Sequence, residues 1–213
     1  MFFQRDYILR MIEMMGDFMR RIGEMLDDMH RFRLLSDACR EHCGIDLDAA
    51  GKLSVESLQE LLAPQPRLMM AEILYIQAMQ TSLPEEKREE LLYRAARLLL
   101  SLREESLLCE LRHERLMECM GEARALVTPR DRMDAAAFLA EAERFDGAED
   151  QVYQALAEAE AGAYPGLLRE GTALMESLLV VPQKRLQEGG LPLTEVLESI
   201  ATLKKRQAAL TNA

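Results

Sequence analysis

Two clusters of cysteine and histidine contain the residue types that bind zinc most readily in proteins. One is Cys39-x-x-His42-Cys43, and the other is Cys109-x-x-x-His113. Thiolate and imidazole are common zinc ligands, and spacings of three and four place side chains on one side of a helix. Neither cluster contains a Cys-x-x-Cys pair, and cysteine often serves as a small buried residue. We therefore expect structural cysteines and no bound metal.

Other catalytic patterns are incomplete. Glu110-x-x-His113 has the spacing of a ligand pair in a di-iron helix bundle, but such a site needs the motif twice and two further glutamates. The sequence has no nucleophile elbow, no glycine-rich phosphate loop and no Cys-x-x-Cys redox pair. We expect a protein that is not an enzyme and has no cofactor; a metal-dependent enzyme is the less favoured alternative.

Composition bounds the class of protein. The chain has 213 residues, a net charge of −11 and a pI near 4.9, and Leu, Ala, Glu, Arg and Met dominate. These residues favour helices, and the negative charge argues against a nucleic-acid partner, because phosphate binding needs clustered Lys and Arg. No secretory signal is recognisable, and no run approaches 18 apolar residues. We expect a cytoplasmic protein with free thiols and no membrane span.

Helical periodicity organises the chain. Residues 2–33 carry two neighbouring apolar rows, which predict a long amphipathic helix that contacts more than one neighbour. We predict a break near His30 to Arg33 and then a second helix, Leu34–Cys43. Gly and Pro divide the remainder into short-looped helices, about ten in all. The pattern predicts one all-α domain, 1–213, with possible sub-units 1–63, 66–127 and 129–213.

Two helix starts have a distinct local signature. Ser82 and Thr128 are each followed three residues later by an acid, Glu85 or Asp131, and each segment has a proline near the first helical position. This pattern is typical of a capping box. We predict helices beginning at both places.

One helix pair resembles a tetratricopeptide (TPR) unit. In the first helix of this pair, Ala136 and Leu139 stand where the unit has a small and a large residue. In the second helix, an aromatic residue is followed by small residues seven apart; the matching residues are Phe145, Ala148, Val152, Ala155 and Leu156. Arg132, Ala135 and Glu160 depart from the usual Trp, Leu and Pro. The resemblance implies antiparallel helix pairs stacked as a short, degenerate TPR-like array.

The opening of the chain, Phe3-x-x-Asp6-Tyr7-Ile8-x-Arg10-Met11-Ile12, resembles the start of an uncharacterised bacterial family of cytosolic TPR-like proteins. The resemblance extends over the whole chain, including Gly189-Gly190-Leu191-Pro192. It implies an all-helical fold and a bacterial cytoplasmic setting. It implies no activity.

The best TPR-like pair lies in an acidic segment. Residues 134–170 contain nine acids and two bases, which would attract a basic partner. We predict a non-enzymatic interaction module or adaptor that binds a protein or peptide segment, with partner-binding residues Glu149, Asp150, Glu158 and Glu160. The alternative is a homo-oligomeric structural protein that uses the Met-rich N-terminal helix, so the sequence leaves monomer and homodimer both open.

Overall fold

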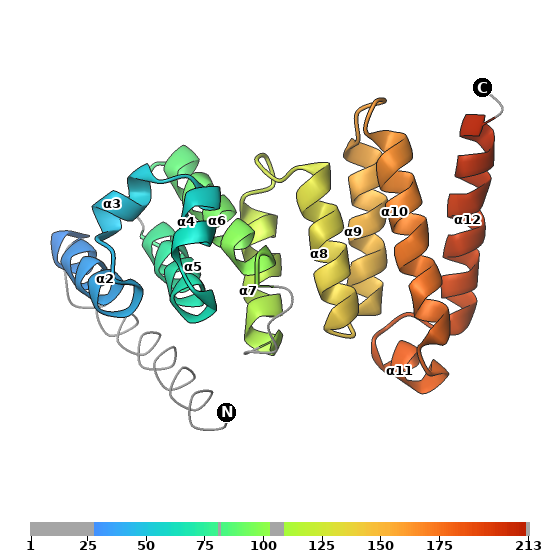
Figure 1. Cartoon of the computed structure of the whole chain (residues 1–213), viewed down its shortest axis with the longest axis horizontal. Coiled ribbons are helices and arrows are strands. Elements are labelled where there is room, and N and C mark those ends of the chain that lie inside the picture. The colour runs from blue at the N-terminus through green and yellow to red at the C-terminus, as the bar shows by residue number, and fades with distance from the viewer. Residues whose placement is uncertain (1–27, 81, 103–108, 212–213) are drawn as a thin grey trace. The chain divides into compact units, whose positions relative to one another are not determined.

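The computed structural model of the chain describes residues 28–80, 82–102 and 109–211 (Figure 1). These ranges contain eleven α-helices and one short 3-10 helix, and no strand lies within them. The prediction of an all-α protein is confirmed for this part of the chain. Most of the predicted N-terminal helix, residues 2–27, lies outside the described residues.

Backbone contacts divide the chain into two compact units. The first ends at Leu126, and the second begins at Val127. This division lies close to the sub-unit boundary expected between residues 127 and 129. The expectation of one domain over 1–213 stays a prediction.

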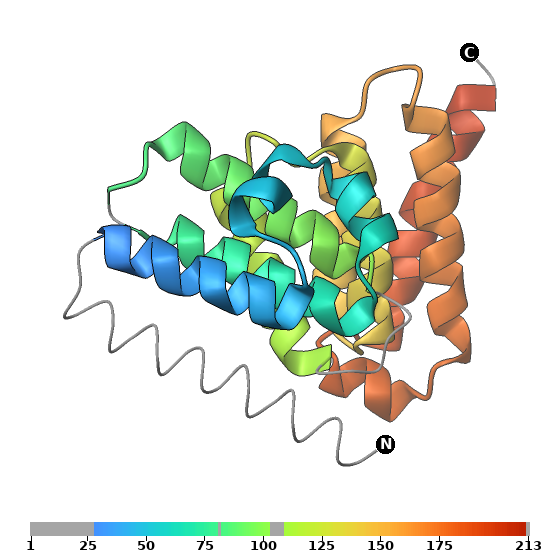
Figure 2. The same cartoon turned by 60° about the vertical axis from the view of Figure 1, so that its left-hand side comes forward.

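The first unit is built around one helix that is buried on almost all sides. All seven residues from Leu68 to Leu74 are buried, as expected for a helix that neighbours surround. This helix, α5 (Pro64–Ala78), pairs in antiparallel fashion with α6 (Glu85–Leu100), and α2 (Asp28–Cys43) lies alongside it (Figure 2). The helices of this unit are α2 (Asp28–Cys43), α3 (Leu47–Lys52), α4 (Val55–Leu61), α5 (Pro64–Ala78), α6 (Glu85–Leu100) and α7 (Cys109–Glu122).

Helix α2 runs without interruption from Asp28 to Cys43, so the predicted break at 30–33 is wrong. No glycine or proline stands there to end a helix. Leu35, Cys39 and Cys43 are buried at spacings of four, which gives α2 one continuous apolar face.

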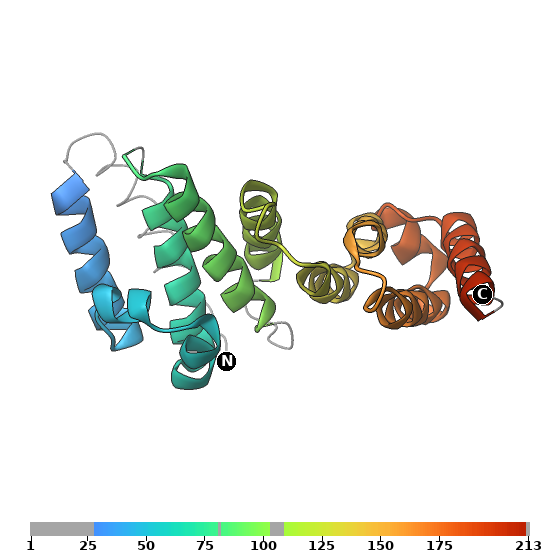
Figure 3. The same ribbon diagram turned by 90° about the horizontal axis from the view of Figure 1, so that it is seen from above.

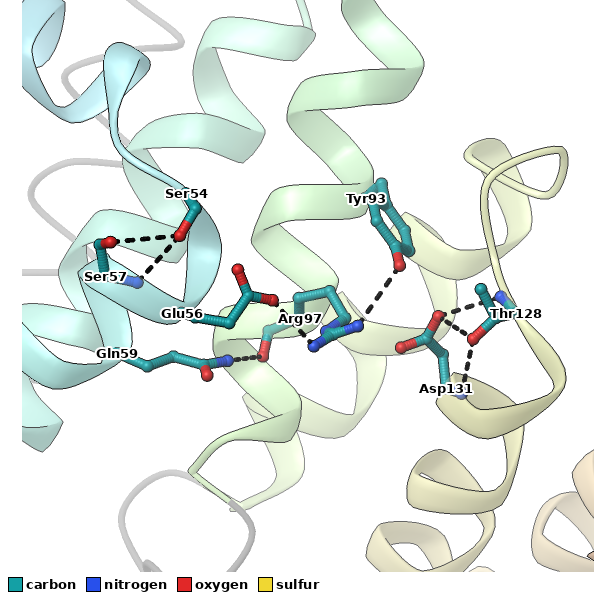
Figure 4. Close-up of polar contacts among 8 residues, drawn as sticks. All are labelled: Ser54, Glu56, Ser57, Gln59, Tyr93, Arg97, Thr128 and Asp131. Atoms are coloured by element: carbon teal, nitrogen blue, oxygen red, sulfur yellow. Dashed lines mark hydrogen bonds and ion pairs between the residues drawn. The ribbon is translucent and has the colours of Figure 1, made fainter.

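Long polar side chains hold the short helices α3 and α4. Arg94 on α6 donates to the carbonyl oxygens of Ala50 at 2.8 Å, Gly51 at 3.0 Å and Leu53 at 2.8 Å. These carbonyls lie at and just beyond the end of α3, where the helix supplies few donors; the Ala50 carbonyl also accepts from the Leu53 amide at 3.2 Å. Gln59 Nε2 on α4 donates to the Arg97 carbonyl of α6 at 3.1 Å (Figure 4). The guanidinium therefore caps the end of α3, and the Gln59 amide fastens α4 to α6.

The second unit consists mainly of four helices of 13 to 19 residues that lie side by side; Figure 3 looks nearly along several of their axes. Helices α8 (Pro129–Glu141) and α9 (Phe145–Glu158) form an antiparallel pair. Helices α10 (Tyr164–Ser177) and α12 (Leu193–Thr211) pack together beside this pair. The elements are α8 (Pro129–Glu141), α9 (Phe145–Glu158), α10 (Tyr164–Ser177), the 3-10 helix η1 (Leu178–Val180), α11 (Gln183–Glu188) and α12 (Leu193–Thr211).

Of the two predicted capping boxes, one is confirmed. Thr128 Oγ1 accepts from the Asp131 amide at 3.2 Å, and the Asp131 carboxylate accepts from the Thr128 amide at 2.9 Å (Figure 4). The other is wrong. Helix α6 starts at Glu85, its N-cap is Pro84 and no side chain caps it. Ser82 therefore lies two residues before the cap position, too early to act as one.

Small residues allow the α8–α9 pair to approach closely. Ala136 on α8 and Ala148 and Ala155 on α9 are completely buried. Gly171 serves the same purpose between α10 and α9, since a Cβ atom there would lie 2.6 Å from Val152 Cγ1. The second unit thus depends on small side chains for its helix spacing.

The Gly189–Gly190 turn braces the start of α9. The Gly189 carbonyl oxygen accepts from the amides of Phe145 at 3.0 Å and Asp146 at 3.2 Å. Helix α9 has no side-chain N-cap, so this turn satisfies two of its exposed amides. Arg185 on α11 adds an ion pair with Glu143 beside the same turn.

No helix in the described ranges is long and apolar enough to cross a bilayer.

Candidate functional site

The acidic segment 134–170 covers parts of α8 and α10 and all of α9. Four of its nine carboxylates form ion pairs with arginines that lie outside the segment. The acids are Asp134, Glu143, Glu158 and Glu170, and the arginines are Arg130, Arg132 and Arg185. As a result, much of the charge expected from the sequence is neutralised within the fold.

Glu158 has a structural position. Its carboxylate accepts from Arg132 Nε at 2.6 Å and from a terminal nitrogen of the same guanidinium at 3.0 Å. Only 5% of the Arg132 side chain is exposed, and Gln151 and Gln154 of α9 accept from its remaining terminal nitrogen at 3.3 and 2.8 Å. The guanidinium is thus fully used by α9, which explains how a charged side chain can lie buried between the two helices.

The other three predicted partner-binding residues differ in exposure. Asp150 and Glu160 are exposed, whereas Glu149 is half-buried and hydrogen-bonded to Ser199 of α12. Burial raises the pKa of Glu149, and the Ser199 hydrogen bond only partly offsets this effect; Asp150 and Glu195 raise the pKa further by repulsion. Within the described ranges, no ion pair involves Glu149, Asp150, Glu160 or Glu195, in contrast to Glu158.

Helix α12 therefore contributes to the same surface. Glu195 lies within electrostatic reach of Glu149, and the Tyr153 hydroxyl lies 3.0 Å from Ser199 Oγ. The guanidinium carbon of Arg206 lies 5.4 Å from the centre of the Tyr153 ring. We call Glu149, Asp150 and Glu195 the α9–α12 acidic surface. Sequence reasoning missed Glu195 because it is 46 residues from Glu149 and no motif connects them.

The cysteine clusters are placed in the first unit. Cys39 and Cys43 are both buried on α2 and hydrogen-bond to one another, and the Cys43 thiol lies 3.4 Å from the Pro66 carbonyl oxygen. Hydrogen bonding to Cys39 and burial raise the pKa of Cys43, which disfavours the thiolate that a metal would need. The side chain of His42, which lies between the two cysteines in the sequence, is half-buried.

The second cluster is only partly described. His113 is half-buried on α7, and the side chain of Cys109 lies outside the described part. Cys119, further along α7, is buried, and burial raises its pKa to about 12. Among the side chains that the structure describes, no three of the metal-binding types converge.

A polar cluster between α5 and α7 could not be predicted from the sequence. Arg115 Nε donates to both oxygens of Glu72 at 3.2 and 3.3 Å, and another nitrogen donates to Glu118 at 2.7 Å. The same guanidinium stacks 3.5 Å from the centre of the Tyr75 ring, and the Tyr75 hydroxyl donates to Glu118 at 2.5 Å. Burial raises the pKa of Glu72 despite Arg115. Because each of these side chains has a partner in the other helix, the cluster joins α5 to α7.

Comparison with known proteins gives the family. No curated protein and no solved structure matches the chain. A family model described as "Family of unknown function (DUF6483)" matches residues 2–208. Because this match covers almost the whole sequence, the chain belongs to that family, DUF6483.

Proposed function

We propose that the protein is a non-enzymatic interaction module of TPR-like type that binds a protein or peptide segment. The observation that carries the proposal is the close packing of α8 and α9 through Ala136, Ala148 and Ala155. These are positions where a TPR unit has small residues. Stacked helix pairs of this kind form extended binding surfaces.

The buried thiols support a role without catalysis. A reactive cysteine is an accessible thiolate of lowered pKa. Cys43 and Cys119 are instead buried with raised pKa values, and Cys39, whose pKa is lowered by its hydrogen bond with Cys43, is completely buried and inaccessible. The polar cluster around Arg115 is likewise bonded internally.

The partner's chemistry follows from the charge that remains unpaired. The second unit contains nine Lys and Arg against 14 Asp and Glu. Its α9–α12 acidic surface, together with Glu160, leaves four carboxylates without an ion pair in the described ranges. Such a surface favours encounter with a basic segment. Glu158 is left out of the proposed contact because Arg132 occupies its carboxylate.

Affinity capture from the native cytosol tests the proposal. The bait is the full chain, compared with the variant Glu149→Gln/Asp150→Asn/Glu160→Gln. The matched control is Glu41→Gln/Glu60→Gln/Glu114→Gln, which removes three exposed carboxylates from the first unit and changes the net charge equally.

We expect one stoichiometric partner with a basic segment, retained by the wild-type chain and the control and lost or depleted by the second-unit variant. Equal depletion of the partner by both variants would place the contact elsewhere or make it a general effect of charge. Failure to retain any partner, combined with a concentration-dependent dimer in light scattering, would favour the homo-oligomeric alternative.

A further inference from the structure

We draw no further inference here: the strongest candidate, the exposed apolar turn at the end of α10 that carries Leu179 and Val180, carries nothing because no feature of the described residues shows what covers it.

Discussion

Replacing Gly189 with alanine should destabilise the second unit through a direct steric conflict. A Cβ atom at Gly189 would lie 2.3 Å from the Glu143 carbonyl oxygen and 2.5 Å from Phe145 Cδ2. The first contact is with backbone and the second is with a side chain that is only 2% exposed. Neither neighbour can rotate away, so the Gly189–Gly190 turn must move from the start of α9.

The expected cost combines two effects. Moving the turn weakens the hydrogen bonds from the Phe145 and Asp146 amides to the Gly189 carbonyl, each worth about 1 kcal/mol. Overpacking against Phe145 adds roughly 1–3 kcal/mol. We therefore expect Gly189→Ala to lower the free energy of unfolding by about 2–5 kcal/mol.

Urea denaturation followed by circular dichroism measures the change, and hydrogen exchange of peptides covering residues 143–150 localises it. Gly166→Ala is the matched control: Gly166 is exposed on α10, and a Cβ atom there meets nothing within 4 Å. The control should be neutral or stabilising by up to about 1 kcal/mol, because alanine favours helices more than glycine does. A Gly189→Ala protein as stable as wild type, with unchanged exchange over 143–150, would refute the role assigned to the turn.

Three further substitutions test the polar contacts. Glu158→Gln should cost about 1–2 kcal/mol in urea denaturation, because it leaves the buried Arg132 without its carboxylate; the figure is reduced because Glu158 is itself about one-third exposed. An unchanged stability would show that Arg132 does not need the ion pair. Arg94→Met should cost about 2–4 kcal/mol, since the carbonyls of Gly51 and Leu53 lose the Arg94 donor and the Ala50 carbonyl keeps only the Leu53 amide; a loss below about 0.5 kcal/mol contradicts this. For Glu72, burial raises the native pKa above its ordinary value of 4.5, so the native state binds the proton more tightly than the unfolded state. The stabilisation from protonated Glu72 is complete below pH 4.5 and is lost as the pH rises through the native pKa. Glu72→Gln should therefore remove the fall in stability over this pH range. A stability–pH curve of unchanged shape would contradict the assignment.

Local patterns predicted much of the secondary structure. The Thr128 capping box marks the start of α8. The Thr128 signal succeeds because the interacting groups are within a few residues of one another. The Ser82 prediction failed for a related reason. A capping box forms only if the helix begins at the residue after the capping serine, here Leu83, whereas α6 begins at Glu85.

Contacts between distant residues could not be predicted. Arg132 is buried against Glu158, which is 26 residues away in the sequence. Arg94 reaches carbonyls that lie 41 to 44 residues earlier. Both contacts depend on which helices pack together, and periodicity defines a helix face without naming its neighbour.

The same limit applies to the candidate site. A run of acids in the sequence indicated a negative field, yet the arginines that neutralise part of it come from outside the run. Glu195 joins the surface only because α12 returns beside α9. The segment was therefore a useful guide to the region, whereas the individual residues of the surface require the fold.

The central proposal is a binding surface for a basic segment, and the association rate of the captured partner tests it most directly. The rate should be measured by stopped flow at low and high salt for the wild type, for Glu149→Gln/Asp150→Asn/Glu160→Gln and for the matched control. The Debye length is about 8 Å at physiological ionic strength, so electrostatic steering weakens as salt rises. We predict that the wild-type and control rates fall strongly with salt, while the second-unit variant starts slower and depends less on salt. Three proteins with the same rate and the same salt dependence would contradict the proposal and leave the carboxylates as an ordinary solvated surface.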